Sequence, residues 1–201
     1  MEGSVVISFD RTPTGCIIGI DPGVTGAVAF LDTDRWRLGV IDMPTIDVTV
    51  AGKDRREPSP HALAQIIRVV KPLLVCSEQL SNFGFHPNPN DLMKMGRWRG
   101  QIEGVVAASE VGFEHPRPDV WKKRMGLNSD KKFSATRANA LFPLCRDQWK
   151  RAKDHDRAEA ACIALYGCFG LGLMPQPPIK PMRVKIDNTI VVEDDEEEIA
   201  A

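Results

Sequence analysis

The sequence has little of several features that mark specialised classes of protein. Its 201 residues contain no apolar run of membrane-spanning length and no apolar segment typical of a secretory leader near the start. The five cysteines include no CxxC pair, so neither a disulfide framework nor a zinc site is expected. These absences predict a cytoplasmic protein with reduced thiols and no membrane partner, in which Cys16, Cys76 and Cys162 are small core residues.

The chain also lacks a large net charge, but its charges are unevenly distributed. The formal net charge is −1. Residues 175–201 contain three basic and seven acidic residues, whereas residues 115–153 contain eleven Lys and Arg against three Asp, a balance of +8. A basic block of this size is typical of a surface that binds a polyanion such as nucleic acid, and the alternative is a solvated helical face.

Composition divides the chain into a folded part and a tail. The chain is 43% hydrophobic and 26% charged, which is ordinary for one globular domain. From Pro175 onward the sequence is first rich in proline and then acidic, without apolar periodicity. We therefore predict one domain over residues 1–174 and a disordered tail over residues 175–201.

Apolar patterning predicts an α/β fold. Cys16 to Asp32 contains two apolar runs joined by a turn at Pro22 and Gly23, and residues 36–41 complete an antiparallel meander. The other predicted elements are an edge strand or frayed end at 5–9, an irregular surface connection at 44–59, helices at 61–70, 91–110, 131–141 and 156–169, and strands at 73–76 and 111–115. This order predicts a mixed five-stranded sheet, in which the three-strand meander joins parallel strands, with helices flanking it.

Acidic residues occur where three of the predicted elements begin or end. Asp21 ends the first strand of the meander, Glu78 follows the strand at 73–76, and Asp156 and Glu159 lie three residues apart at the start of the last helix. Each residue alone is also explained by turn or helix-cap chemistry. Together they predict carboxylates that converge and repel one another unless a divalent cation lies between them.

A set of ligands made only of carboxylates favours a hard metal ion. Such oxygen ligands suit Mg²⁺, with Mn²⁺ as a substitute, and two ions about 3.5–4 Å apart can activate water and stabilise the leaving oxygen of a phosphodiester. Asp154 and Asp156 both remain candidates for the third acid. The glycines around the first acid, Gly19, Gly23 and Gly26, are expected to let a phosphate backbone come close.

An ordered set of motifs resembles the RuvC-type Holliday junction resolvases of the ribonuclease H-like superfamily, especially phage-borne versions. The matching segments are GIDPGVTG at 19–26, SEQ at 77–79, GRWRGQIEGV at 96–105, PDVWKKRMGL at 118–127, DKK at 130–132 and DHDRAEAACIALYG at 154–167. The resemblance spans residues 16–170 and implies a ribonuclease H-like fold. It also implies a metal-dependent endonuclease of a bacterial or phage-infected cell, which resolves four-way junctions or other branched DNA by symmetric nicking in recombination, repair or phage genome processing.

The resemblance implies roles for individual residues. The metal-binding catalytic acids are Asp21, Glu78, Asp156 and Glu159, the last of which stands where many relatives have Asp. The further implied residues are the catalytic lysines Lys122 and Lys131 and the DNA contacts Phe83, Lys123, Arg124 and Lys132. An unpaired base of the junction can stack on an aromatic ring such as Phe83, although a phenylalanine that closes its loop onto the core is an equal alternative.

The resemblance further implies a homodimer, because the helix predicted at 91–110 resembles the dimer helix of the family. A two-fold dimer places two active sites on strands of like polarity in a four-way junction. Two other functions are open from the sequence. One is a catalytically inactive protein that binds branched DNA through the basic block. The other is an actin-like ATPase, whose opening loop is similar to GIDPG but which needs a second domain that 201 residues hardly accommodate.

Overall fold

The computed structural model describes residues 6–50, 52–80, 88–128, 131–151 and 153–187. The helices are α1 (Pro60–Val70), α2 (Pro89–Ala108), α3 (Pro118–Met125), α4 (Lys131–Leu141) and α5 (His155–Gly170). The main sheet contains β2 (Cys16–Asp21), β3 (Ala27–Asp32), β4 (Arg37–Asp42), β7 (Leu74–Ser77), β8 (Gly112–Glu114) and β9 (Lys180–Pro181). Two separate pairs of strands are β1 (Val6–Phe9) with β10 (Val184–Asp187), and β5 (Thr45–Val50) with β6 (Lys53–Pro58).

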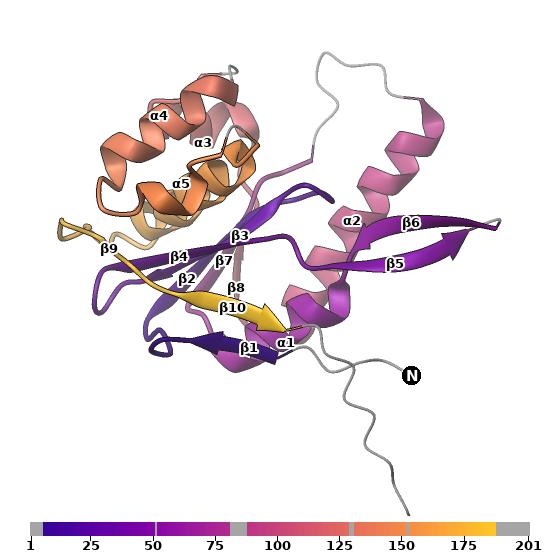
Figure 1. Cartoon of the computed structure of the whole chain (residues 1–201), viewed down its shortest axis with the longest axis horizontal. Coiled ribbons are helices and arrows are strands. Elements are labelled where there is room, and N and C mark those ends of the chain that lie inside the picture. Colours follow the sequence, from indigo (N-terminus) through magenta and orange to yellow (C-terminus); the bar gives the residue numbers. More distant parts are fainter. Residues whose placement is uncertain (1–5, 51, 81–87, 129–130, 152, 188–201) are drawn as a thin grey trace, which may run out of the picture.

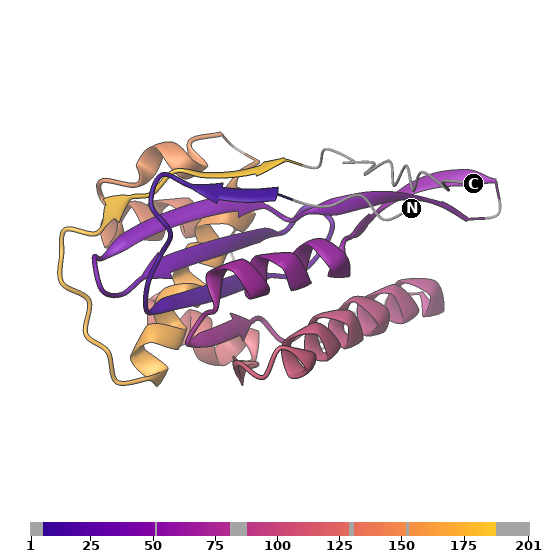
Figure 2. The same ribbon diagram turned by 90° about the horizontal axis from the view of Figure 1, so that it is seen from below.

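The main sheet has helices against both faces, as Figure 1 and Figure 2 show. Its strand order is β8-β7-β2-β3-β4-β9. β2, β3 and β4 form the predicted antiparallel meander, and β7 and β8 continue the sheet in parallel from β2. The predicted count of five strands is wrong, because the two-residue strand β9 pairs along β4 as a sixth, edge strand.

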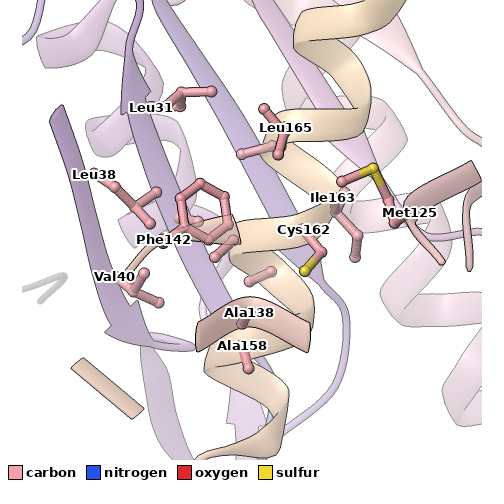
Figure 3. Packing of buried hydrophobic residues seen from close by; sticks show 14 of the residues in the cluster. Leu31, Leu38, Val40, Met125, Ala138, Phe142, Ala158, Cys162, Ile163 and Leu165 are labelled. Carbon is pink, nitrogen blue, oxygen red and sulfur yellow. The ribbon is translucent and has the colours of Figure 1, made fainter. Parts of the chain in front are cut away.

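Alternating side chains of β2 and β3 supply two hydrophobic cores. On one face Ile17 and Leu31 pack with α3, α4 and α5, and Figure 3 shows part of this cluster around α5. On the other face Ile18 and Phe30 pack with α1 and α2. Burial of both faces explains why these strands are continuously apolar rather than alternating. Within the described ranges, no helix is both long and apolar enough to span a membrane.

Helix α5 lies in backbone contact with β2. A Cβ atom at Gly19 would lie 2.4 Å from the carbonyl oxygen of Ala160 and 2.4 Å from the amide nitrogen of Ala164. Further along the helix, a Cβ atom at Gly167 would lie 3.3 Å from Ile17. Since the residue number rises along α5 while it falls along β2, the helix runs antiparallel to this strand.

This packing determines where the first turn of α5 lies. From Gly19 to Asp21 is two strand residues, about 6.6 Å. From Ala160 back to Asp156 is one helical turn, about 6 Å. The two steps run in the same direction, so the contact at Gly19 brings Asp156 level with the end of β2.

Residues 44–59, which were expected to form an irregular connection, instead form the β5–β6 hairpin. Strand β6 is polar, but in β5 the apolar residues Ile46 and Val48 alternate with Asp47 and Thr49, a two-residue period that favours a strand. The prediction of an irregular connection followed the polar composition of the segment and missed this period. In the fold Ile46 is 46% exposed. Figure 1 and Figure 2 show the hairpin and the N-terminal half of α2 extending together beyond the edge of the sheet. An ion pair of 3.0 Å between Glu57 of β6 and Arg97 of α2 links them.

The tail predicted over residues 175–201 is partly folded. Ile179 and Met182 are buried, and β10 pairs antiparallel with β1. The prediction of disorder is therefore wrong for residues 179–187, and the boundary at residue 174 falls within the folded part. Only four residues alternate in β10, and its partner β1 is more than 170 residues away, which local patterning cannot anticipate. The acidic run lies outside the described residues.

We expect Gly19→Ala to lower the free energy of unfolding by about 1–3 kcal/mol, because the added methyl group must push α5 away from β2. Urea denaturation followed by circular dichroism measures this change. Thr136→Ala, at an exposed position of α4, is the control, since alanine is the better helix former and should not lower the stability there. Unchanged stability in Gly19→Ala would contradict the close packing.

Candidate active site

The four predicted acids come together at one edge of the sheet. Asp21 is the last residue of β2. Glu78 directly follows β7, and its backbone amide donates to the carbonyl oxygen of Ile20 at 3.1 Å, so Glu78 continues the β2–β7 pairing beside Asp21. Asp156 and Glu159 lie in the first two turns of α5, and both are buried. We call Asp21, Glu78, Asp156 and Glu159 the acid cluster.

Mutual repulsion is the main electrostatic property of the acid cluster. Burial raises the pKa of Asp21 well above its ordinary range, and the negative charges of Glu159, Asp156 and Glu78 raise it further. Because the charges of all three other acids raise the pKa of Asp21, this residue lies at the centre of the cluster. Only a cation can relieve this repulsion without protonating a carboxylate.

One lysine reaches into the acid cluster. Lys122 extends from α3, and its ammonium nitrogen Nζ lies 3.0 Å from Oε2 of Glu159. Burial lowers the pKa of Lys122, but the negative charges of Glu159, Glu78 and Asp21 outweigh burial and leave the pKa raised. Lys122 is therefore charged at neutral pH and neutralises part of the cluster.

Two uncharged donors hold the glutamates in place. The indole Nε1 of Trp121 donates to Oε2 of Glu78 at 2.7 Å. The hydroxyl of Ser134, which is fully buried on α4, donates to Oε1 of Glu159 at 2.7 Å. Sequence reasoning missed both donors. The sole signal for Trp121 is its place beside Lys122 in the motif PDVWKK, and Ser134 has none.

The structure distinguishes the two candidates for the third acid. Asp154 accepts from Arg151 Nη2 at 2.8 Å, from its Nε at 2.9 Å and from its backbone amide at 3.0 Å. Burial raises the pKa of Asp154, but these bonds from Arg151 outweigh burial and leave the pKa lowered. The negative charge of Asp156 instead raises the pKa of Asp21. Of the two, Asp156 belongs to the acid cluster and Asp154 anchors the start of α5.

The donor chemistry of the acid cluster fits a hard divalent cation. Its available ligand atoms are carboxylate oxygens, and their repulsion is what such a cation offsets. In the part of the chain that the structure describes, no three His, Cys, Asp or Glu side chains are close enough to enclose one ion as they stand. Glu159 is turned toward Lys122 and Ser134, so ion binding requires carboxylates to turn toward the ion.

Two of the residues predicted to contact DNA lie on α3, and their surroundings differ. Lys123 is exposed. The guanidinium of Arg124 lies over the rings of Tyr166 and Phe169, 5.8 and 5.6 Å from their centroids. Tyr166 is seven residues beyond Glu159 on α5, about 10 Å along the helix axis. The structure therefore does not bring Arg124 to the acid cluster.

Three further predicted residues cannot be placed at the site. Phe83 lies outside the described residues. Lys131 and Lys132 begin α4, the helix that also carries Ser134, but their side chains lie outside what the structure describes. Their roles stay predictions.

Two of the three glycines around Asp21 are needed for close packing within the protein and do not open the site to a phosphate backbone. Gly19 receives the backbone of α5, and a Cβ atom at Gly26 would lie 2.1 Å from the carbonyl oxygen of Asp21. Of the three glycines expected to admit a phosphate backbone, Gly23 alone has nothing within 4 Å of its Cβ position. The expectation is therefore wrong for Gly19 and Gly26.

No family model matches the chain, and no curated protein matches its sequence. Among solved structures, it is similar to Thermus thermophilus RuvC in complex with a Holliday junction substrate. The TM-score is 0.52 at 12% identity, covering 79% of this chain and 97% of that chain. Another Thermus thermophilus RuvC structure gives a TM-score of 0.50 at 14% identity, covering 78% of this chain and 96% of that chain. The chain has the RuvC fold.

The RuvC fold confirms the predicted ribonuclease H-like architecture of a mixed sheet between helices. At identities of 12 and 14%, the likeness is one of fold. The site itself is described by the polar groups of this chain at the ends of β2 and β7. The acid cluster, Lys122, Trp121 and Ser134 meet there from four separate elements and the segment after β7.

We expect Asp21→Asn to stabilise the metal-free protein at neutral pH. A carboxyl whose pKa is raised by folding costs stability when it is ionised, so the cost is present at neutral pH and is lost as the pH falls toward the ordinary aspartate value of about 3.9. Thermal unfolding in EDTA should show a melting temperature raised by about 2–4 °C, the shift that 1 kcal/mol produces in a domain of this size.

Asp154→Asn is the matched control for this prediction. Its pKa is lowered by Arg151, so its charge contributes stability at neutral pH, and the substitution should lower the melting temperature. A lowered melting temperature in Asp21→Asn would show that the acid cluster is not under repulsion.

Proposed function

We propose that this chain is a metal-dependent endonuclease that cleaves four-way junctions or other branched DNA. The observation that carries the proposal is the acid cluster at the ends of β2 and β7, with the ammonium group of Lys122 inside it. The fold is that of RuvC structures, one of which is a complex with a Holliday junction substrate. The basic block at 115–153 further favours a polyanionic substrate.

The acid cluster would hold Mg²⁺, or Mn²⁺ in its place, and four carboxylates are enough for two ions. Bound ions supply water activation and neutralise the charge that develops on a phosphodiester during hydrolysis. The hydrogen bonds from Trp121 to Glu78 and from Ser134 to Glu159 restrict how these carboxylates turn. They therefore lower the conformational entropy that the two glutamate side chains would lose when an ion binds.

Lys122 is the protein's own cation at the reacting phosphate in this proposal. Its raised pKa keeps the ammonium group charged at neutral pH. When a phosphodiester is bound, the ammonium group would move from Glu159 to the phosphate. There it would stabilise the extra negative charge of the transition state. Lys131, at the start of α4, is the second proposed lysine.

We also infer a homodimer that forms through α2. The N-terminal half of this helix extends beyond the sheet, and Met93 there is 74% exposed. Gly96, Gly100 and Gly104 follow one another at four-residue spacing on one side of α2, and a Cβ atom at each would meet nothing within 4 Å. Such a stripe lets a second helix approach closely. A two-fold dimer supplies two acid clusters for a four-way junction.

Cleavage of a synthetic four-way junction in Mg²⁺ tests the proposed activity, with a matched linear duplex for comparison. Wild type should make paired, symmetric nicks in the junction alone. Asp21→Asn and Glu159→Gln should lower the cleavage rate by more than about 100-fold while junction binding persists, because loss of a ligand costs at least as much as loss of its supporting partner. Asp119→Asn, an exposed carboxylate on α3, is the control and should keep full activity.

Two results would redirect the proposal. Tight junction binding without cleavage in Mg²⁺ or Mn²⁺ would identify an inactive branched-DNA-binding protein. ATP turnover without DNA binding would overturn the nuclease assignment in favour of the actin-like alternative.

Sedimentation velocity tests the homodimer. Wild type should sediment as a dimer and Gly100→Leu as a monomer, because the leucine side chain fills the space along the stripe. Lys94→Leu adds the same side chain at an exposed position about 120° around α2 from Gly100 and should leave the dimer intact. A monomeric wild type, or a dimeric Gly100→Leu, would exclude this interface.

A further inference from the structure

A polar hollow of about 450 Å³ adjoins the acid cluster. It is formed by the turn after β2, the end of β4, strand β6 and the segment before α5. The lining residues that matter here are Val24, Thr25, Met43, Arg56, Lys153 and Asp156. Because Asp156 belongs both to the hollow and to the acid cluster, a ligand in the hollow lies next to the proposed site of cleavage.

The β5–β6 hairpin reaches the hollow because it starts at the same edge of the sheet as Asp21. Asp21 pairs with Ala27, and Ala27 pairs with Asp42 at the end of β4. β5 begins three residues later at Thr45. The hairpin is thus a wall of the site and not a remote surface loop.

Two cationic side chains in the hollow form no ion pair with any described residue. Arg56 on β6 is exposed, and its Nη2 donates to the hydroxyl of Thr45 at 3.1 Å. Its cross-strand neighbour Asp47 does not pair with it. Lys153 is exposed just before α5. These two charges come from segments nearly one hundred residues apart, so the fold has brought them to one hollow.

The acids of the hollow outside the acid cluster are already neutralised. Asp42 accepts a hydrogen bond from Arg157, and Arg151 lies 4.0 Å from its Oδ2. These arginines lower the pKa of Asp42, chiefly through the Arg157 hydrogen bond. Asp154 is bound to Arg151, as described above. The charges that remain for a ligand are therefore those of Arg56 and Lys153 and, on the side of the acid cluster, the pair of His155 with Asp156.

We propose that this hollow binds the phosphodiester backbone of the DNA strand next to the cleavage site, with Arg56 and Lys153 contacting its phosphates. The proposal rests on the proposed function and names where the substrate strand runs. The volume lies within the range of about 300–1,000 Å³ of ligand pockets, which accommodates a nucleotide unit. A guanidinium and an ammonium group are the usual phosphate ligands, and the side chains of Val24 and Met43 offer an apolar wall to the sugar.

Strand β6 supplies a matched control for Arg56. Arg55 precedes it, so its side chain lies on the opposite face of the hairpin. Arg56 shares its face with Thr45, to which it is hydrogen-bonded. Arg55 shares its face with Glu57, which pairs with Arg97 of α2. The two arginines have the same charge and are both exposed, but Arg56 alone lines the hollow.

The experiment measures the affinity for a four-way junction over a range of salt concentrations, with Ca²⁺ in place of Mg²⁺. Each phosphate contact that is lost should lower the slope of log K against log salt concentration by about 0.9. In the proposed homodimer each substitution removes one contact per protomer, so Arg56→Ala and Lys153→Ala should each lower the slope by about 1.8 and weaken binding more than about tenfold at low salt. The double variant should lose about four contacts per junction, and Arg55→Ala should match wild type.

A second measurement identifies the contact as one with a DNA phosphate. Single neutral methylphosphonates are placed in turn at the positions that flank the nick. One position should weaken binding by wild type but have no further effect on Arg56→Ala. Melting temperatures of all variants confirm folding, and Arg56→Gln provides a second variant that keeps a donor for Thr45.

The outcomes separate this proposal from the proposed function. If wild type cleaves junctions while Arg56→Ala and Arg55→Ala have the same affinity and slope, the hollow is not a backbone site and the nuclease assignment stands. If wild type neither binds nor cleaves junctions, the proposed function fails and the hollow loses its ligand with it. If inorganic phosphate without DNA raises the melting temperature of wild type but not of Arg56→Ala, the hollow takes a small anion instead of a DNA strand.

Discussion

The backbone contact between Gly19 and α5 is the constraint on which the candidate site depends. The helix can lie directly on β2 because no Cβ atom separates them, and the same contact brings the first turn of α5 level with Asp21. One packing interaction therefore stabilises the core and positions the acids. Any change that lifts α5 from the sheet should affect stability and the site together.

The acid cluster adds an electrostatic cost to this well-packed core. Burial and three neighbouring carboxylates raise the pKa of Asp21, while Lys122 offsets part of the repulsion from within. Strands β2 and β3 are buried almost throughout, so apolar packing outweighs this cost. Electrostatic repulsion among buried titratable groups is typical of functional sites, and in the proposed function bound cations would relieve it.

Two elements extend together beyond the edge of the sheet that carries the acid cluster. The β5–β6 hairpin and the segment before α5 enclose the hollow with Arg56 and Lys153. Helix α2 extends beside the hairpin with its open glycine stripe, and the ion pair between Glu57 and Arg97 joins the two projections. In the proposed function, one projection guides the DNA strand and the other joins the two protomers.

The sequence by itself determined the parts that depend on short-range patterns. The apolar runs of β2 and β3, the helical spacing of α1 and the position of Asp21 after a buried strand are all legible within a few residues. Helix α4 has the predicted bounds, and α1, α2 and α5 begin or end within two residues of theirs. The hairpin was not predicted although Ile46 and Val48 alternate with polar residues in β5, because the surrounding segment is polar and β6 has no apolar stripe. Strand β10 has only four residues, and its pairing depends on a partner strand more than 170 residues away.

Only the tertiary structure decided which polar groups meet. The family resemblance favoured Asp156 over Asp154 by its spacing to Glu159, but only the fold shows that Arg151 binds Asp154 while the charge of Asp156 reaches Asp21. Trp121 and Glu78 are 43 residues apart, and Ser134 and Glu159 are 25 apart. Apolar burial follows a local period, whereas a hydrogen bond or ion pair depends on two side chains that only the completed fold brings within about 3 Å.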